Sequence, residues 1–237
     1  MKRFLWATSV ALCLSGAVHA ASTAVIVDVE PPVITRRTFD PKHPPADMPR
    51  LTPPEIGTCV YSFGCTTELQ IRGPENRPAR VTEVRVRPRL VITLWTPQEG
   101  PPKILAHEEA HRAICEHYYA PAESLARELA QRELGRTLKS AANQKTAVEA
   151  EVRVIQDALI ADFLRETAKR CDFAQARFDV ITQHSISFIP EEEAMATALA
   201  EEKAAYAANH SETQRDQTAG AGAGVPDRSP PTRPGNR

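Results

Sequence analysis

The spacing of its prolines constrains the fold of this 237-residue chain more than any other feature. Eight prolines lie between residues 31 and 54, whereas only Pro121 and Pro190 lie between residues 103 and 225. A proline inside a helix removes a backbone hydrogen bond and clashes with the preceding turn. Long helices are therefore expected only in the second half of the chain, with a break at Pro121 and a new start after Pro190.

The two ends of the chain are expected to lie outside the folded body. Residues 21–55 should form a Pro-rich extended arm, in which residues 23–29 can add one strand. Residues 210–237 carry a Gly-Ala repeat and a cluster of prolines, a composition that cannot bury a core and predicts a disordered tail. Residues 56–209, about 150 in all, suit a single domain.

The first twenty residues are typical of an export signal. Lys2 and Arg3 precede a short apolar stretch, and residues 17–20 end with small side chains at the positions that a signal peptidase reads, so we expect cleavage after Ala20. The stretch is too short to span a bilayer, and no later segment is long enough. The mature protein is therefore expected to be periplasmic or secreted, without a membrane span.

The charge balance gives little sign of a nucleic-acid partner. The chain has 29 basic and 30 acidic residues, and both basic residues of the export signal leave with it. The remainder is mildly acidic and contains no long basic block. We therefore expect no binding to nucleic acid.

Four of the five cysteines remain after the export signal is removed. An even number in an oxidising compartment favours disulfides. Cys59 and Cys65 bracket a stretch that is expected to turn, so they should pair as the rims of a hairpin, which leaves Cys115 and Cys171 to join two helical regions. Four cysteines allow three pairings, and a zinc site made of all four, although without C-x-x-C spacing, is the alternative.

The hydrophobic pattern indicates an α+β fold. Between residues 59 and 95 apolar residues alternate with polar ones, and Pro88 among them indicates a break or an edge. Residues 103–210 are rich in Ala, Glu, Leu and Arg; Gly135 and residues 140–143 should loosen or end the second helix, and the third is expected at about residues 146–169. The prediction is a small N-terminal antiparallel sheet followed by a helical body.

His107, Glu108 and His111 form the pattern H-E-x-x-H. On a helix, residues four apart project from one face, so both imidazoles can bind a single zinc ion. Glu108 lies beside that face, where a carboxylate can take a proton from water as the water attacks a carbonyl group. This pattern is typical of zinc peptidases. The alternative is a polar helix whose two histidines face solvent.

Glu109 and Arg112 depart from the usual form of this motif. In active zinc peptidases the variable positions inside it are mostly uncharged, and the residue after the second histidine is mostly apolar. Both side chains can lie on the solvent side of the helix. Because of these departures, the motif supports metal binding more strongly than it supports proteolysis.

A catalytic zinc site needs three protein ligands and leaves one position for water. His117 stands ten residues after His107, as in metzincins, but Ile114 occupies the position where that motif needs a glycine turn. If the helix continues, His117 points about 80° away from His107. The other candidates for the third ligand are Glu149, Glu151 and His184.

A second motif, Phe178-Asp179-x-x-Thr182-x-His184-Ser185, follows the first after a largely helical stretch. The two motifs together resemble a bacterial family of predicted secreted zinc-dependent proteases of uncharacterised function, over roughly residues 59–184. This family typically has Tyr and Gly where the present chain has Phe178 and Ser185. The resemblance implies a zincin-like fold and a peptidase activity, and it favours His184 as the third zinc ligand.

Other side chains near the two motifs have possible supporting roles. Asp179 can orient a ligand imidazole without itself binding the metal, and Thr182 can form a hydrogen bond nearby. An ordinary helix end or turn is the alternative for both. Tyr118 and Tyr119 can stabilise an oxyanion opposite zinc, with packing as the alternative role.

The leading hypothesis is a metallopeptidase that binds one zinc ion through His107, His111 and His184 and uses Glu108 as general base. Its expected partner is a peptide or protein substrate. The alternative is a non-catalytic cell-envelope scaffold or binding protein with a structural or vestigial metal site. A zinc-dependent amidase that acts on cell-wall peptides shares the site and differs only in substrate. The sequence determines neither the substrate nor the oligomeric state.

Overall fold

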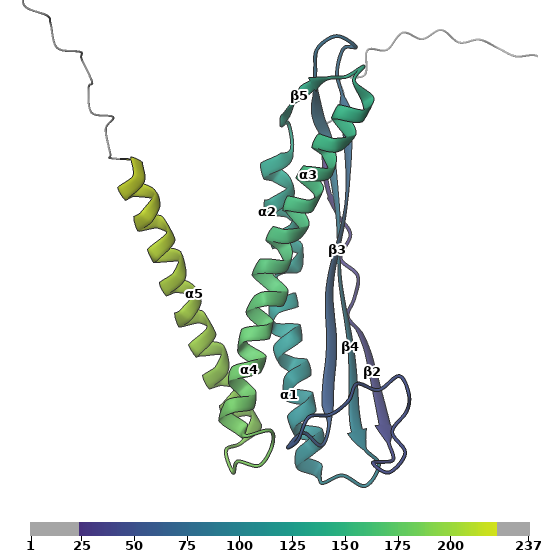
Figure 1. Ribbon diagram of the computed structural model, residues 1–237, viewed down its shortest axis with the longest axis vertical. Helices are drawn as coiled ribbons and strands as arrows, with labels where there is room; N and C mark the ends of the chain where they lie inside the picture. The colour runs from purple at the N-terminus through teal and green to yellow at the C-terminus, as the bar shows by residue number, and fades with distance from the viewer. Residues whose placement is uncertain (1–23, 222–237) are drawn as a thin grey trace, which may run out of the picture.

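The computed structural model describes residues 24–221, with backbone alone at residue 210 and beyond residue 211 (Figure 1). The predicted cleavage after Ala20 and the last part of the predicted tail lie outside the described residues. A long, narrow sheet forms one layer, and helices pack along one of its faces. The last helix leaves the lower end of this body at an angle. The structure is thus mixed α and β, as predicted.

The central strand of the sheet is β4 (Pro78–Pro97). Strand β3 (Thr58–Arg72) pairs with one edge of β4 in antiparallel orientation along almost its whole length. The other edge is shared by β5 (Thr137–Ala141), which is antiparallel to β4, and by β1 (Ala24–Val27) and β2 (Val33–Phe39), which are parallel to it.

The prediction of a purely antiparallel sheet is therefore wrong, because the sheet is mixed. The N-terminal arm causes the difference. It is extended, as expected from its prolines, but its first part pairs with β4 instead of lying free. Because residues 24–39 run in the same direction as β4, both of the strands that they form are parallel to it.

Pro88 lies inside β4 and is fully buried, so it does not end the strand. On the β3 side Pro88 is in register with Cys65, and on the other side its carbonyl oxygen accepts a hydrogen bond of 3.0 Å from the Glu30 amide. In a strand, the N–H and C=O of one residue point to the same side. The side of Pro88 that lacks an N–H therefore faces the edge of β4 that β1 and β2 share. At this point along the edge, pairing with β1 has ended and pairing with β2 has not begun. The predicted break is a change of partner strand.

The helical half begins with α1 (Pro102–Tyr119) and α2 (Ala122–Glu133), separated at Pro121 as predicted. Then follow α3 (Lys145–Leu164), a π-helical turn η1 (Arg165–Lys169) and α4 (Arg170–Thr182), which form one continuous rod. The last helix, α5 (Glu191–Ala221), begins after Pro190 as predicted. Within residues 24–221, none of these helices has the length and apolar character needed to cross a bilayer.

Two boundaries in the helical half differ from the predictions. Helix α5 continues to Ala221, so residues 210–221, which we expected in the tail, are helical. Gly135, with a φ of +81°, ends the second helix as expected, but the chain then forms strand β5, where only a loosened or ended helix was predicted. Strand β5 has little apolar periodicity of its own and is specified by its pairing with the start of β4.

The core lies between β4 and the helices. The apolar residues that alternate along β4 are all buried on one face of the sheet: Val81, Val84, Val86, Leu90, Ile92 and Leu94. They form a continuous cluster with Ile114 of α1, Phe163 of α3 and Phe178 of α4. Each fully buried side chain of this size contributes roughly 1.5–3 kcal/mol. This cluster fixes α1 against the sheet and α4 against α1, and these two helices carry both sequence motifs.

The predicted Cys59–Cys65 disulfide is wrong. Residues 60–64 do not turn, because they continue strand β3 from Cys59 to Cys65 without interruption. Six residues of strand span about 20 Å, and a disulfide needs Cα atoms within about 7 Å. The structure does bring Cys115 and Cys171 together, with their sulfur atoms 3.8 Å apart and both thiols free.

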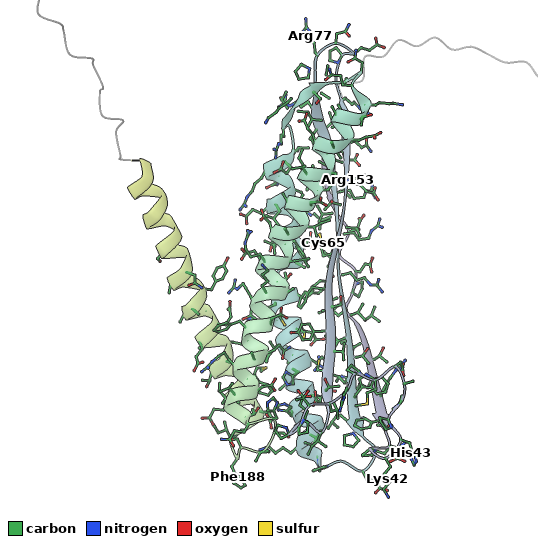
Figure 2. The ribbon with its side chains drawn as sticks, viewed as in Figure 1. Lys42, His43, Cys65, Arg77, Arg153 and Phe188 are labelled. Atoms are coloured by element: carbon green, nitrogen blue, oxygen red, sulfur yellow. The ribbon has the colours of Figure 1, made fainter. Side chains whose placement is uncertain are left out.

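We predict that mild oxidation joins Cys115 to Cys171, because the two thiols need only a small approach to reach bonding distance. The measurement is peptide mapping by mass spectrometry of the protein before and after treatment with a disulfide oxidant. Cys65, which lies midway along the sheet (Figure 2), should remain a free thiol. A Cys59–Cys65 cross-link in the folded protein would contradict the strand assignment.

Candidate metal centre

The H-E-x-x-H motif lies on α1, and its functional face is buried. His107, Glu108 and His111 are 4%, 2% and 8% exposed, so the alternative of two solvent-facing histidines is wrong. Glu109 and Arg112 lie on the other side of the helix, as expected. The Arg112 Nε donates to Glu109 Oε2 over 2.5 Å, and Arg36 of β2 donates to the other oxygen of the same carboxylate over 2.6 Å. The two charged residues of the motif therefore pair with each other and with β2.

Three ligand atoms converge where α1 meets α4. The Nε2 atoms of His107 and His111 are 3.1 Å apart, and Asp179 Oδ1 lies 3.3 Å from the first and 3.0 Å from the second. Ligand atoms about 2.0–2.1 Å from a shared metal ion are separated by about 2.9–3.4 Å, depending on the angle at the metal. His107, His111 and Asp179 can therefore hold a metal ion without moving.

Hydrogen bonds at the other ring nitrogens favour the tautomer of each histidine that carries its proton on Nδ1. The side-chain N–H of Gln175 donates to the His111 carbonyl oxygen over 2.9 Å. The side-chain oxygen of Gln175 is therefore left to accept a hydrogen bond from His111 Nδ1. His107 Nδ1 lies 3.4 Å from a carboxylate oxygen of Glu191, at the start of α5. With both Nδ1 atoms protonated, the two Nε2 lone pairs face each other and a carboxylate oxygen. Such an arrangement of acceptors is stable only around a cation.

Electrostatics at the site support the same conclusion. Burial opposes ionisation of Asp179, yet the hydrogen bonds and charges of His107 and His111 hold the pKa of its carboxyl below the ordinary value. Burial lowers the pKa of His111, and the larger combined effect of Asp179, Glu108 and Gln175 raises it above its ordinary value. The centre therefore attracts positive charge, either as protons or as a metal ion.

Phe178 orders the two imidazoles. Its ring lies 4.9 Å from the centroid of each, stacked on His107 and edge-on to His111. Phe178 is fully buried and belongs to the second motif, one residue before Asp179. Thr182 Oγ1 donates to the Phe178 carbonyl oxygen over 2.8 Å, which stabilises the last turn of α4. The structure thus brings the two motifs together.

His184 and Asp179 exchange the places that we predicted for them. Asp179, expected to support a ligand, belongs to the ligand group, whereas His184, expected as a ligand, does not. Helix α4 ends at Thr182, and the next three residues have positive φ angles, so His184 lies at the rim of the site and is not on the helix face that meets α1. Its Nδ1 is 3.6 Å from Asp179 Oδ1, and its side chain is 35% exposed.

The other alternative ligands lie elsewhere. Helix α1 continues through Ile114, so His117 is exposed and its ring contacts Tyr118. Glu149 is exposed on α3 and lines a different cavity, with Lys145 and Gly73. Glu151 accepts hydrogen bonds from the Lys139 and Ser140 amides, so it fixes β5 to α3.

A cavity of about 220 Å³ opens onto the three ligand atoms. It lies at the lower end of the molecule in Figure 2, the end that carries Phe188. Its walls come from the end of the N-terminal arm, the first residues of β3, α1, α4 and the turn after α4. They consist of Glu55, Ile56, Gly57, Thr58, Cys59, Tyr61, His107, Glu108, His111, Gln175, Asp179, His184 and Ser185.

Glu108 also faces this cavity and has an oxygen, Oε2, with no hydrogen-bond partner. Burial raises the pKa of its carboxyl to about 7. Glu108 lies against Gly57, where a β-carbon would be 2.7 Å from its Oε1 and 2.9 Å from the Trp95 carbonyl oxygen. Sequence patterns did not identify Gly57, Gln175 and Glu191 as part of the site, because each reaches it only through tertiary packing.

We predict that Asp179→Asn lowers the affinity for a divalent metal by at least about 100-fold, the upper range for loss of a group that merely orients a ligand. His184→Asn should retain full metal content, because its imidazole lies outside the ligand group. The measurement is elemental analysis after dialysis against zinc, iron(II) and manganese(II), followed by titration with the preferred metal. An equal loss of metal in both variants would show that His184 is a ligand.

Two imidazoles, a carboxylate and a second buried carboxylate therefore surround the inner end of an open cavity. No family model matches the chain, and no curated protein and no solved structure matches it. The function of this protein is therefore inferred from the geometry of the side chains at this centre.

Proposed function

We propose that this protein is a zinc-dependent metallopeptidase in which His107, His111 and Asp179 bind the metal and Glu108 is the general base. The observation that carries the proposal is Glu108 itself. Its side chain is buried beside the three ligand atoms, faces the cavity, and leaves one oxygen without a partner. An unpaired buried carboxyl is costly to a fold, so a position of this kind favours a catalytic role.

Zinc, when bound, supplies a Lewis acid that polarises a carbonyl group and makes water more acidic. The chain's own residues complete the chemistry. Glu108 takes a proton from the attacking water and then delivers it to the leaving amine. Gln175 and Glu191 hold the two imidazoles in the orientation that keeps their Nε2 lone pairs directed at the metal position.

Two features support a peptide as substrate. The cavity is open to solvent, with three protein ligands around the metal position, the number that a catalytic zinc site has. Its wall includes the first residues of β3, a strand that pairs on one edge only within residues 24–221. An extended peptide can add to a free strand edge through backbone hydrogen bonds. A zincin-like fold and export through the signal at residues 1–20 belong to the same proposal.

The alternative is a non-catalytic scaffold whose metal is structural. A structural site is closed by four protein ligands, whereas only three side chains converge here among the described residues. The charged motif residues Glu109 and Arg112 had favoured the scaffold, but they are satisfied by each other and by Arg36 on the opposite side of α1. An amidase that acts on cell-wall peptides shares all of these features, and substrate assays distinguish it from a general peptidase.

We predict that Glu108→Gln retains one bound metal ion but loses about 10²–10⁴-fold in kcat, because the amide cannot take the proton from water. The matched control is Glu109→Gln, the adjacent carboxylate on the outer side of the same helix, which should keep nearly full activity. Both variants are assayed with a quenched fluorescent peptide library and by elemental analysis. Equal activity of Glu108→Gln and the wild type would exclude the mechanism.

We also predict that Gly57→Ala lowers kcat by about 100-fold while metal content is unchanged. The added methyl group would lie 2.7 Å from Glu108 Oε1 and 2.9 Å from a backbone oxygen, so Glu108 must move. A displacement of about 1 Å at a reacting group can cost this much. Gly64→Ala is the control, because the nearest atoms to its added carbon lie at 3.8 Å or more. An unaffected Gly57→Ala enzyme would show that the position of Glu108 is not critical.

A further inference from the structure

We propose that His184 donates the hydrogen bond that stabilises the oxyanion formed on the substrate carbonyl during hydrolysis. This inference rests on the proposed peptidase function. It identifies a hydrogen-bond donor for the oxyanion, which the proposed site does not otherwise contain. When water attacks a peptide bond, negative charge develops on the carbonyl oxygen, and a fixed donor aimed at it is worth about 10²–10³ in kcat. The ligands and the general base do not supply this donor.

The tyrosines near the site are engaged elsewhere. Tyr118, expected as a candidate, donates its hydroxyl to Glu202 over 2.8 Å, and Tyr119 donates to the Glu30 carbonyl oxygen over 2.7 Å. Tyr61 lines the cavity but donates to Asp172 over 2.7 Å. Each hydroxyl therefore has an acceptor on a neighbouring element, and none is left for a substrate.

Among the described residues that line the cavity, few other side-chain donors are available. The Gln175 amide donates to the His111 carbonyl oxygen and lies 3.1 Å from the Cys115 sulfur. No lysine or arginine is part of the lining. His184 remains as the one nitrogen donor whose ring forms no hydrogen bond within the described part of the chain. Thr58 and Ser185 supply hydroxyl groups, which are the nearest alternatives.

The position of the His184 ring suits this role. Its Nδ1 lies 3.6 Å from Asp179 Oδ1, one of the three ligand atoms, which is too long for a hydrogen bond. The ring is thus beside the metal position without being bound to it, and its N–H is available to a substrate. About a third of the side chain is exposed, toward the cavity that it lines.

The backbone that holds His184 in this position is strained. Gln183, His184 and Ser185 have φ angles of 51°, 53° and 72°, a left-handed region that is unfavourable for residues other than glycine. Hydrogen bonds fix the turn, from the His184 amide to the Asp179 carbonyl oxygen at 3.2 Å and from the Ser187 amide to Thr182 at 2.8 Å. Had α4 continued, His184 would lie about 140° around the helix from Asp179. Strain retained in this way is typical of functional sites.

The test compares His184→Ala and His184→Asn with two controls. Asparagine tolerates the left-handed backbone, so that variant keeps the turn while it removes the ring. Ser185→Ala removes the neighbouring hydroxyl, and His117→Ala removes an exposed histidine from α1. For each protein we would measure metal content, kcat and KM on one peptide, and the binding of a phosphinic peptide, whose tetrahedral group imitates the oxyanion.

Both His184 variants should keep one metal ion per chain and a KM within about threefold, while kcat falls by about 10²–10³. The affinity for the phosphinic peptide should fall by the same factor, and His117→Ala should match the wild type. Loss of metal, an unchanged kcat, or a loss of equal size in Ser185→Ala would each overturn the role of His184. If the wild type, loaded with zinc, hydrolyses no peptide, the proposed function fails and this inference fails with it.

Discussion

The structure depends on one contact, the packing of α1 against α4 that brings two imidazole nitrogens and a carboxylate oxygen within 3.3 Å of one another. Three buried acceptors so close together repel one another unless a cation lies between them. The fold holds them in place through the shared ring of Phe178 and through Gln175, which reaches from α4 to α1. The three candidate ligands are therefore held in place by the packing of the fold, which is the usual requirement for a functional site.

The sheet gives this contact a rigid support. Strand β4 is paired on both edges, and its buried face packs on α1 and α2, while α4 packs on α1. The start of β3 then forms one wall of the cavity, and Gly57, just before it, leaves room for the Glu108 side chain. The three candidate metal ligands, Glu108 and the cavity wall thus come from elements that share one core, so their relative positions cannot change independently.

The two buried thiols lie behind the same contact. Cys115 is on α1, four residues after His111, and Cys171 is on α4, four residues before Gln175. The Gln175 amide lies 3.1 Å from the Cys115 sulfur and also donates to the His111 backbone. A covalent bond between the thiols would tie the two ligand-bearing helices together next to the residue that orients His111. Cys115 and Cys171 are therefore important because they lie on the two helices that carry the candidate ligands. The hairpin predicted between Cys59 and Cys65 does not form.

The sequence by itself determined the features that rest on local periodicity. The spacing of His107 and His111 put both rings on one helix face, the alternation along β4 identified the core, and Pro121 and Pro190 marked helix starts. Local pattern also placed a second motif at residues 178–184, although it gave the ligand role to His184 instead of Asp179.

Only the tertiary structure decided what depends on direction and distance between elements. Cys59 and Cys65 are close in sequence but lie on one strand, whereas β1 and β2 pair with β4 because of how the arm runs along it. Asp179 lies beside the two histidines because it is still on the face of α4 that meets α1, and a left-handed turn after Thr182 moves His184 to the rim. Sequence spacing fixes which side chains share a face of one element, but the meeting of two faces is fixed by packing, which no local pattern records.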